Sequence, residues 1–128
     1  YTANIERGID TSGILTMDYT GFKAVSMAAK DCAAPARCII QGTKGYIQQK
    51  STANCCGGIT FHPNEGKEEH YNLNGGRPRE AAEFETFARA MESGDQELCT
   101  RMQDTSIAVS RVLTVARRSA GIRFPGEK

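Results

Sequence analysis

The hydrophobic and polar positions nearest the start of the chain predict a β-hairpin. Residues 14–19 and 22–28 form two short runs of β-prone residues. Residues 20–21, Thr-Gly, separate the two runs, and a two-residue connection that contains glycine is typical of a tight hairpin. In this register Asp18 faces Lys23, and opposite charges on neighbouring strands stabilise the pairing. The same register pairs Tyr19 with Phe22, Met17 with Ala24 and Thr16 with Val25.

Two more hairpins are predicted further along the chain. Residues 37–41 and 46–49 flank the turn 42–45, and residues 58–62 and 68–73 flank a turn that contains Pro and Gly. The Gly-Thr-Lys-Gly turn joins two strands and does not open a helix, so we interpret it as a turn and not as a phosphate-binding loop. Six short strands in three hairpins favour an antiparallel sheet.

The last third of the chain has helical periodicity. Arg77 and Pro78 lead into the first predicted helix, where proline suits the first turn, and Gly94 suits the position just past its end. Its apolar residues recur at the 3.6-residue spacing of a helix: Phe84, Phe87, Ala88 and Met91.

A second predicted helix ends in a basic turn. Arg117 and Arg118 lie where the helix dipole favours cations, Gly121 stops the helix, and Ile122 suits the apolar contact of a Schellman ending. Its apolar stripe has steps of four and three residues: Leu98, Met102, Thr105, Val109, Val112 and Ala116. Strands followed by helices predict one α+β domain over residues 1–128, an open, mostly antiparallel six-stranded sheet with two C-terminal helices on one face.

The first hairpin has two faces of different composition. The richer face, which we expect to meet the helices, carries Leu15, Met17, Tyr19, Phe22 and Ala24. The opposite face is too apolar for open water and too polar for a core, a mixture that suits a homo-oligomer interface. The predicted interface residues are Ile14, Thr16, Asp18, Lys23, Val25 and Met27.

Composition also favours a chain that relies on other protein surface. Only 22 of 128 residues are Leu, Ile, Val or Phe, which is lean for a folded domain, yet the formal net charge is only +1. This charge balance argues against nucleic acid as a partner. No run of about 18 apolar residues is present, so no membrane span is predicted. We expect a cytoplasmic protein.

The histidines and thiols form no predicted site. His62 and His70 lie several residues out of register on the third hairpin, so we expect exposed strand histidines and not a shared metal. Cys32, Cys38, Cys55, Cys56 and Cys99 show no Cys-x-x-Cys spacing, and the favoured interpretation is reduced, half-buried thiols; a metal or redox site is the alternative.

Three segments together resemble the C-terminal part of the Gfo/Idh/MocA family of NAD(P)-dependent oxidoreductases. Residues 83–95 read EFETFARAMESGD and are similar to the pattern E-F-x-x-F-A-x-A-(I/M)-x-x-G-D. Residues 104–125 contain D-x-S, V-x-x-V and the run ARRSAGIRFP. Residues 39–47, IIQGTKGYI, are similar to a sheet hairpin of that family. The resemblance extends over residues 14–125.

The resemblance implies a two-domain enzyme that oxidises a sugar, inositol or related polyol by hydride transfer. A Rossmann domain, absent from this chain, would bind NAD or NADP, and the α+β domain would supply a wall of the substrate pocket and an oligomer interface. Because the chain begins at Tyr1 and not Met, we expect it to have been cut, processed or numbered from inside a longer protein.

The chain lacks the cofactor-binding and catalytic motifs of the full family pattern. It has no dinucleotide fingerprint, no His four residues after an Asp, and no complete Glu-Lys-Pro motif, because Glu127 and Lys128 have no following proline. No catalytic, cofactor-binding or metal-binding residue is therefore assigned, and the chain alone is predicted to be inactive. Two alternatives remain: a free-standing α+β binding or dimerisation module, and a small enzyme that uses the concave face of the sheet.

Overall fold

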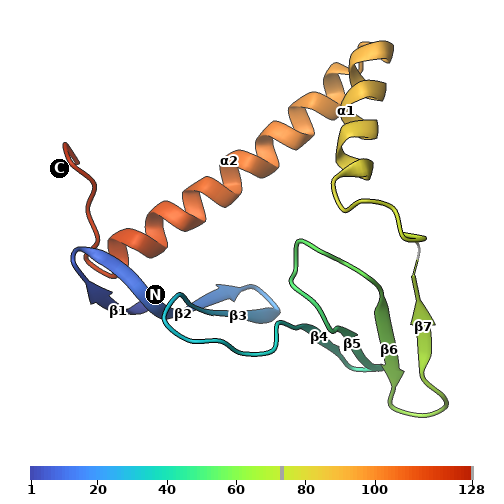
Figure 1. The fold of residues 1–128 in the computed structure, drawn as a ribbon, viewed down its shortest axis with the longest axis horizontal. Helices are drawn as coiled ribbons and strands as arrows, with labels where there is room; N and C mark the ends of the chain where they lie inside the picture. The colour runs from blue at the N-terminus through green and yellow to red at the C-terminus, as the bar shows by residue number, and fades with distance from the viewer. Residues whose placement is uncertain (73, 128) are drawn as a thin grey trace. The chain divides into compact units, whose positions relative to one another are not determined.

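Seven β-strands and two α-helices make up the computed structural model, which describes residues 1–72 and 74–127 (Figure 1). The chain divides into two units. We call Tyr1–Ala33 together with Asp95–Lys128 the terminal unit, and Ala34–Gly94 the central unit.

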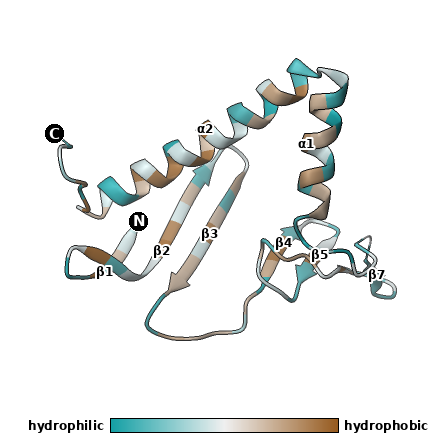
Figure 2. Cartoon of the chain, turned by 45° about the horizontal axis from the view of Figure 1, so that its top comes forward, coloured by the Kyte–Doolittle hydropathy of each residue, from teal (hydrophilic) through white to brown (hydrophobic). Residues whose placement is uncertain are grey.

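The terminal unit contains a three-stranded antiparallel sheet in the order β1-β2-β3. Strand β2 (Ile9–Tyr19) pairs with β3 (Phe22–Ala29) in the predicted register, from Tyr19 opposite Phe22 to Thr16 opposite Val25. Hydrophobic residues are interspersed with polar ones along both strands (Figure 2). The edge strand β1 (Thr2–Glu6) was not predicted, because its five largely exposed residues carry little apolar pattern.

Helix α2 (Gln96–Ser119) also belongs to the terminal unit. The Asp95 side chain caps its start by accepting a hydrogen bond from Leu98 N at 2.9 Å. At its end Gly121 is left-handed, with φ 78°. The Ile122 N–H donates to Arg117 O and the Gly121 N–H to Arg118 O. These two bonds form the predicted Schellman ending.

The central unit contains a second antiparallel sheet in the order β4-β5-β6-β7. Its strands are β4 (Cys38–Gly42), β5 (Gly45–Gln49), β6 (Ile59–Pro63) and β7 (Glu69–Tyr71). The second and third predicted hairpins are present. Strand β7 is shorter than predicted, and the predicted strand residue Leu73 lies outside the described residues.

The prediction of a single six-stranded sheet is wrong, although the α+β class is confirmed. The described residues form seven strands in two sheets. Alternation within a hairpin fixes only the pairing of neighbouring strands; it carries no information on which hairpins share an edge. The helices also fall in different units, α2 with the first sheet and α1 (Ala81–Ser93) with the second.

Helix α1 begins later than predicted. Pro78 precedes it, and the Pro78 carbonyl accepts a hydrogen bond from Ala81 N at 3.0 Å. The helix ends as predicted at Gly94, which is left-handed with φ 66°.

The two units have few buried apolar residues. Among the described residues, the buried hydrophobic ones are Ala90, Ala116 and Ile122. Large side chains such as Val25, Met27 and Met91 are more than three-fifths exposed. The chain therefore presents apolar surface that a folded protein normally covers.

Candidate functional site

The predicted interface residues lie together on one face of the first sheet, which we call the outer face. Their positions follow from the register of β2 and β3, in which directly paired residues share a face. Val25 is 62% and Met27 is 71% exposed, and Asp18 forms an ion pair with Lys23. A patch of large apolar side chains next to an exposed ion pair has the composition of an interface. The oligomer itself stays a prediction.

The opposite, inner face lies against the C-terminal half of α2. A groove of about 370 Å³ separates them, and Leu15 lines it together with Leu113 and Ala116. The face that was expected to meet both helices thus lines a groove with α2 alone, because α1 belongs to the central unit. Tyr19 and Phe22, at the other end of the same face, stack on each other with ring centroids 4.4 Å apart and stay exposed.

Tyr1 and Asp10, which line this groove, belong to a polar network. The Tyr1 hydroxyl donates to Asp10 Oδ2 at 2.8 Å, and Lys30 Nζ lies 2.9 Å from Asp10 Oδ1. Hydrogen bonds from Lys30 and Tyr1 lower the pKa of the Asp10 carboxyl, and the bond to Asp10 raises the pKa of the Tyr1 phenol. A carboxylate that stays ionised and a phenol that stays protonated hold structure and are poor proton-transfer groups at neutral pH.

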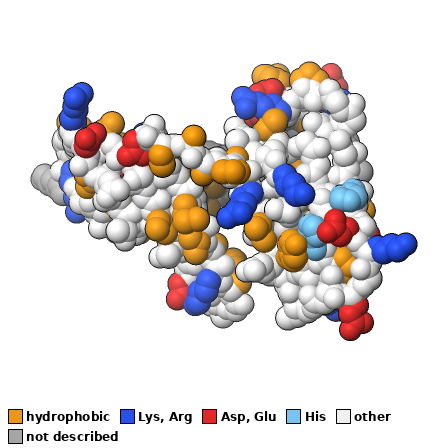
Figure 3. Space-filling model, turned by 60° about the horizontal axis from the view of Figure 1, so that its bottom comes forward, with side chains coloured by type: hydrophobic (Ala, Val, Ile, Leu, Met, Phe, Trp, Pro, Cys, Tyr) orange, Lys and Arg blue, Asp and Glu red, His pale blue; other side chains and the backbone are white. Residues whose placement is uncertain are grey.

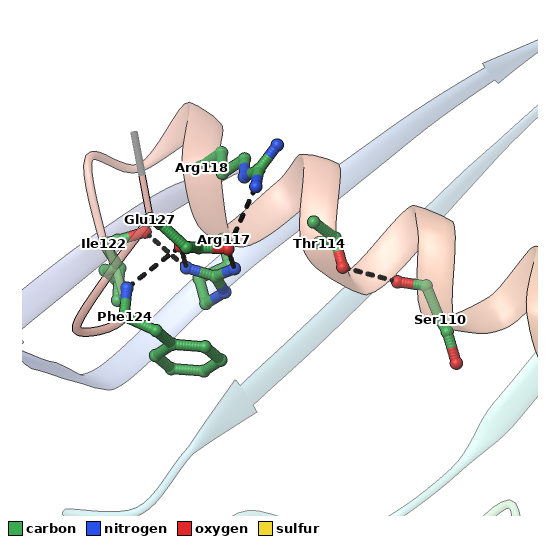
Figure 4. Close-up of polar contacts among 7 residues, drawn as sticks. All are labelled: Ser110, Thr114, Arg117, Arg118, Ile122, Phe124 and Glu127. Carbon is green, nitrogen blue, oxygen red and sulfur yellow. Dashed lines mark hydrogen bonds and ion pairs between the residues drawn. The ribbon is translucent and has the colours of Figure 1, made fainter.

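The chain after α2 folds back onto the helix in what we call the tail clasp (Figure 4). Glu127 receives a bidentate pair from Arg117, with N–O distances of 2.6 and 2.5 Å, and a further bond from Arg118 at 3.0 Å. The Arg117 guanidinium also lies 3.8 Å from the centroid of the Phe124 ring. The clasp holds Ile122 and Phe124 where they line the groove.

The tail clasp strongly perturbs one carboxyl. The hydrogen bonds from Arg117, and then from the Phe124 backbone N–H, hold the pKa of Glu127 far below its ordinary value. This contact was not predicted from the sequence. The sequence signal for this contact is weak, because a glutamate ten residues after an arginine is common. The two residues meet only because the Schellman ending reverses the direction of the chain.

A second polar cluster lies on one face of the central sheet. His62 stacks on Tyr46, with ring centroids 4.3 Å apart, and its Nδ1 lies 2.8 Å from Glu68 Oε1. His70 Nδ1 lies 3.0 Å from Thr60 Oγ1, and its Nε2 is 4.0 Å from Glu68 Oε2. Figure 3 shows the two histidines beside an acidic side chain.

The prediction of exposed histidines holds for His70 and is wrong for His62. The His70 side chain is 72% exposed, but that of His62 is 14% exposed. Strand β5 covers His62 because Tyr46 is its paired neighbour, and strand order is not readable from the hairpin alone. Within the described residues His62 Nε2 is buried and has no hydrogen-bond partner.

The thiols are more accessible than predicted. All five cysteines are exposed and free, so the expectation of half-burial is wrong. Cys38 lies on β4, Cys99 lies on α2, and the other three lie on loops. Among residues 1–72 and 74–127, no cluster of three His, Cys, Asp or Glu side chains is placed to hold a metal ion. Neither of the helices described is long and apolar enough to cross a membrane.

The described residues form two antiparallel sheets and two helices, an α+β arrangement whose sequence motifs resemble those of the Gfo/Idh/MocA dehydrogenases. A comparison with characterised proteins matches scyllo-inositol 2-dehydrogenase (NADP(+)) IolU of Bacillus subtilis (strain 168), 24% identical over 124 residues. The match confirms the resemblance to this family. It covers 97% of this chain and 38% of the relative, so the chain spans well under half of that dehydrogenase.

Two other comparisons give no match. No family model matches the chain, and no solved structure matches it.

Proposed function

We propose that this chain is the C-terminal sheet domain of a dehydrogenase that oxidises a sugar, inositol or related polyol. The observation that carries the proposal is the match to an inositol dehydrogenase along 97% of the chain but only 38% of the relative. In this proposal a Rossmann domain outside the chain binds NAD or NADP. The chain itself supplies a wall of the substrate pocket and, through the outer face, an oligomer interface.

The residues present do not fit a nicotinamide cofactor. A dinucleotide site needs a glycine-rich turn between a strand and a helix, with the pyrophosphate at the helix N-terminus. The N-terminus of α2 is already occupied by the Asp95 carboxylate, and α1 is preceded by the acidic Glu80. Either carboxylate would repel a pyrophosphate, so neither helix N-terminus of this chain suits the cofactor.

The exposed apolar surface supports the same assignment. Hydride transfer from a carbinol requires a base and a positioned cofactor, and both belong to the rest of the enzyme in this proposal. In this proposal the apolar surface of the present chain is covered by that domain and by a second copy of the chain. Val25, Met27 and Met91 offer large exposed apolar side chains for such contacts.

The test compares two forms of the protein. The first is the chain from Tyr1 to Lys128, and the second adds the native coding sequence that precedes Tyr1. We expect NADP(H) to bind only the longer form in calorimetry, and only that form to reduce NAD(P)⁺ with polyols. Micromolar nucleotide binding by the short chain would overturn the assignment, and so would a longer form that neither binds nucleotide nor oxidises a polyol.

A second candidate is a free-standing binding or dimerisation module, which the exposed outer face favours. The two candidates share that face and differ in the upstream sequence. A dimer of the short chain with no glycine-rich fingerprint upstream of Tyr1 would favour the module.

A further inference from the structure

A small pocket in the central unit has a lining that the dehydrogenase proposal does not use. It has a volume of about 400 Å³ and lies where β6 begins and β7 ends, next to the loop of residues 50–58. Lys50, Thr60, His70 and Asn72 supply most of its polar groups. All of its lining residues belong to the central unit.

The charge of the lining has one sign. Among the described residues that line the pocket there is no aspartate and no glutamate. Lys50 forms no ion pair within residues 1–72 and 74–127, whereas Lys23 and Lys30 each have an aspartate partner. The nearest carboxylate to His70 is Glu68, which is closer to His62, at 2.8 Å, than to His70, at 4.0 Å.

Asn72 and Lys50 keep hydrogen-bond donors available at the pocket, whereas the Ser51 hydroxyl donates to Cys55 O at 2.7 Å. The Asn72 carbonyl oxygen accepts from Asn74 N at 3.1 Å, so the two N–H groups of its amide stay available. Buried Thr60 binds His70 Nδ1 at 3.0 Å and fixes the ring, and His70 Nε2 lies beyond hydrogen-bond distance of Glu68. The ammonium of Lys50 adds up to three more donors.

Two glycines form part of the pocket wall. Gly57 and Gly58 contribute to the wall, and without a Cβ they let a ligand approach the backbone closely. Gly58 has φ 140°, and a Cβ at this position would lie 3.1 Å from Tyr71 O. This position therefore requires glycine for the loop to meet the strand.

We propose that this pocket binds a small anion, a phosphate or carboxylate group carried by a metabolite. The ammonium of Lys50 forms no ion pair among the described residues, so an anion would supply the counter-charge that a neutral polyol would not. Lysine is a common phosphate-binding residue because it presents a compact point charge. The proposal does not depend on dehydrogenase activity.

The experiment measures binding of inorganic phosphate to the 15N-labelled chain by NMR titration, in the absence of nucleotide and polyol. We expect saturable shifts confined to Lys50, His70, Asn72 and their neighbours. Lys50→Gln should raise the dissociation constant for phosphate about tenfold, because the variant loses a charged hydrogen bond. The matched control is Lys67→Gln, a lysine in the β6–β7 turn outside the pocket, which should bind as the wild type does.

Each outcome decides the proposal. No saturation by wild type, shifts spread over all lysines, or equal weakening by both variants would overturn it. Acetate and sulfate titrations distinguish a carboxylate site from a phosphate site. If Lys50→Gln fails to fold, the location of the wild-type shifts still tests the site. Failure of the nucleotide experiment leaves this result unaffected, because neither titration contains nucleotide.

Discussion

Gly121 shows how one residue ends an element. Its φ of 78° places it in the left-handed region, and open space surrounds the position where a Cβ would lie. The cost of a side chain here is therefore backbone strain and not a clash.

Gly121→Ala should lower the free energy of unfolding by about 1 kcal/mol, because alanine is strained in the left-handed region. Denaturant titration measures the change. The matched control is Gly57→Ala, since that glycine also has open space around it but is not left-handed. An unchanged or raised stability of Gly121→Ala, or equal effects of both variants, would contradict the assignment.

Glu127→Gln should lower the melting temperature at neutral pH, because it removes the charge that binds Arg117 and Arg118. The folded state lowers the pKa of this carboxyl below its ordinary value of 4.5. Its contribution is therefore present above that pH and is lost progressively as the pH falls toward the lower, folded-state pKa. The melting difference between wild type and variant should stay constant from about pH 7 to about pH 5 and shrink below that, toward about pH 3.

The control for this experiment is Glu92→Gln, an exposed carboxylate with no ion pair among the described residues. Its melting temperature should follow that of the wild type across the range. A Glu127→Gln difference that grows on acidification would refute the role of the tail clasp.

At the scale of elements, the pair β2 and β3 has one face against α2 and one face open. If the outer face is an oligomer interface, Val25→Glu should abolish the dimer and leave the circular dichroism spectrum unchanged, because a buried unpaired charge is costly. The matched control is Val115→Glu on α2, where valine is 67% exposed against 62% for Val25. Light scattering at several concentrations measures the mass. A monomeric wild type, or loss of the dimer in both variants, would contradict the prediction.

At the scale of the whole molecule, the small number of buried apolar residues among those described leads us to predict that association contributes to stability. Partner binding stabilises a fold by mass action, so the melting temperature should rise with protein concentration. Differential scanning calorimetry over a hundredfold range of concentration, about 2 to 200 μM, tests this. A melting temperature independent of concentration would show that the chain is stable without a partner.

The sequence alone was sufficient for structure that depends on near neighbours. The register of Asp18 with Lys23 followed from a two-residue turn between two β-prone runs, and the end of α2 at Gly121 followed from the residues around it. Both are local, because the interacting groups are a few residues apart and compete with no other partner. The resemblance to the dehydrogenase family was likewise carried by motifs that are contiguous in the chain.

Only the tertiary structure decided the features that join distant residues. Two separate sheets replaced the expected single sheet, because hydrophobic alternation does not say which strand edges meet. His62 is covered because β5 places Tyr46 beside it, and Glu127 is ionised far below its ordinary pKa because the turn at Gly121 returns it to Arg117. The Lys50 pocket is formed by a loop and two strands whose donors come together only when β6 pairs with β7.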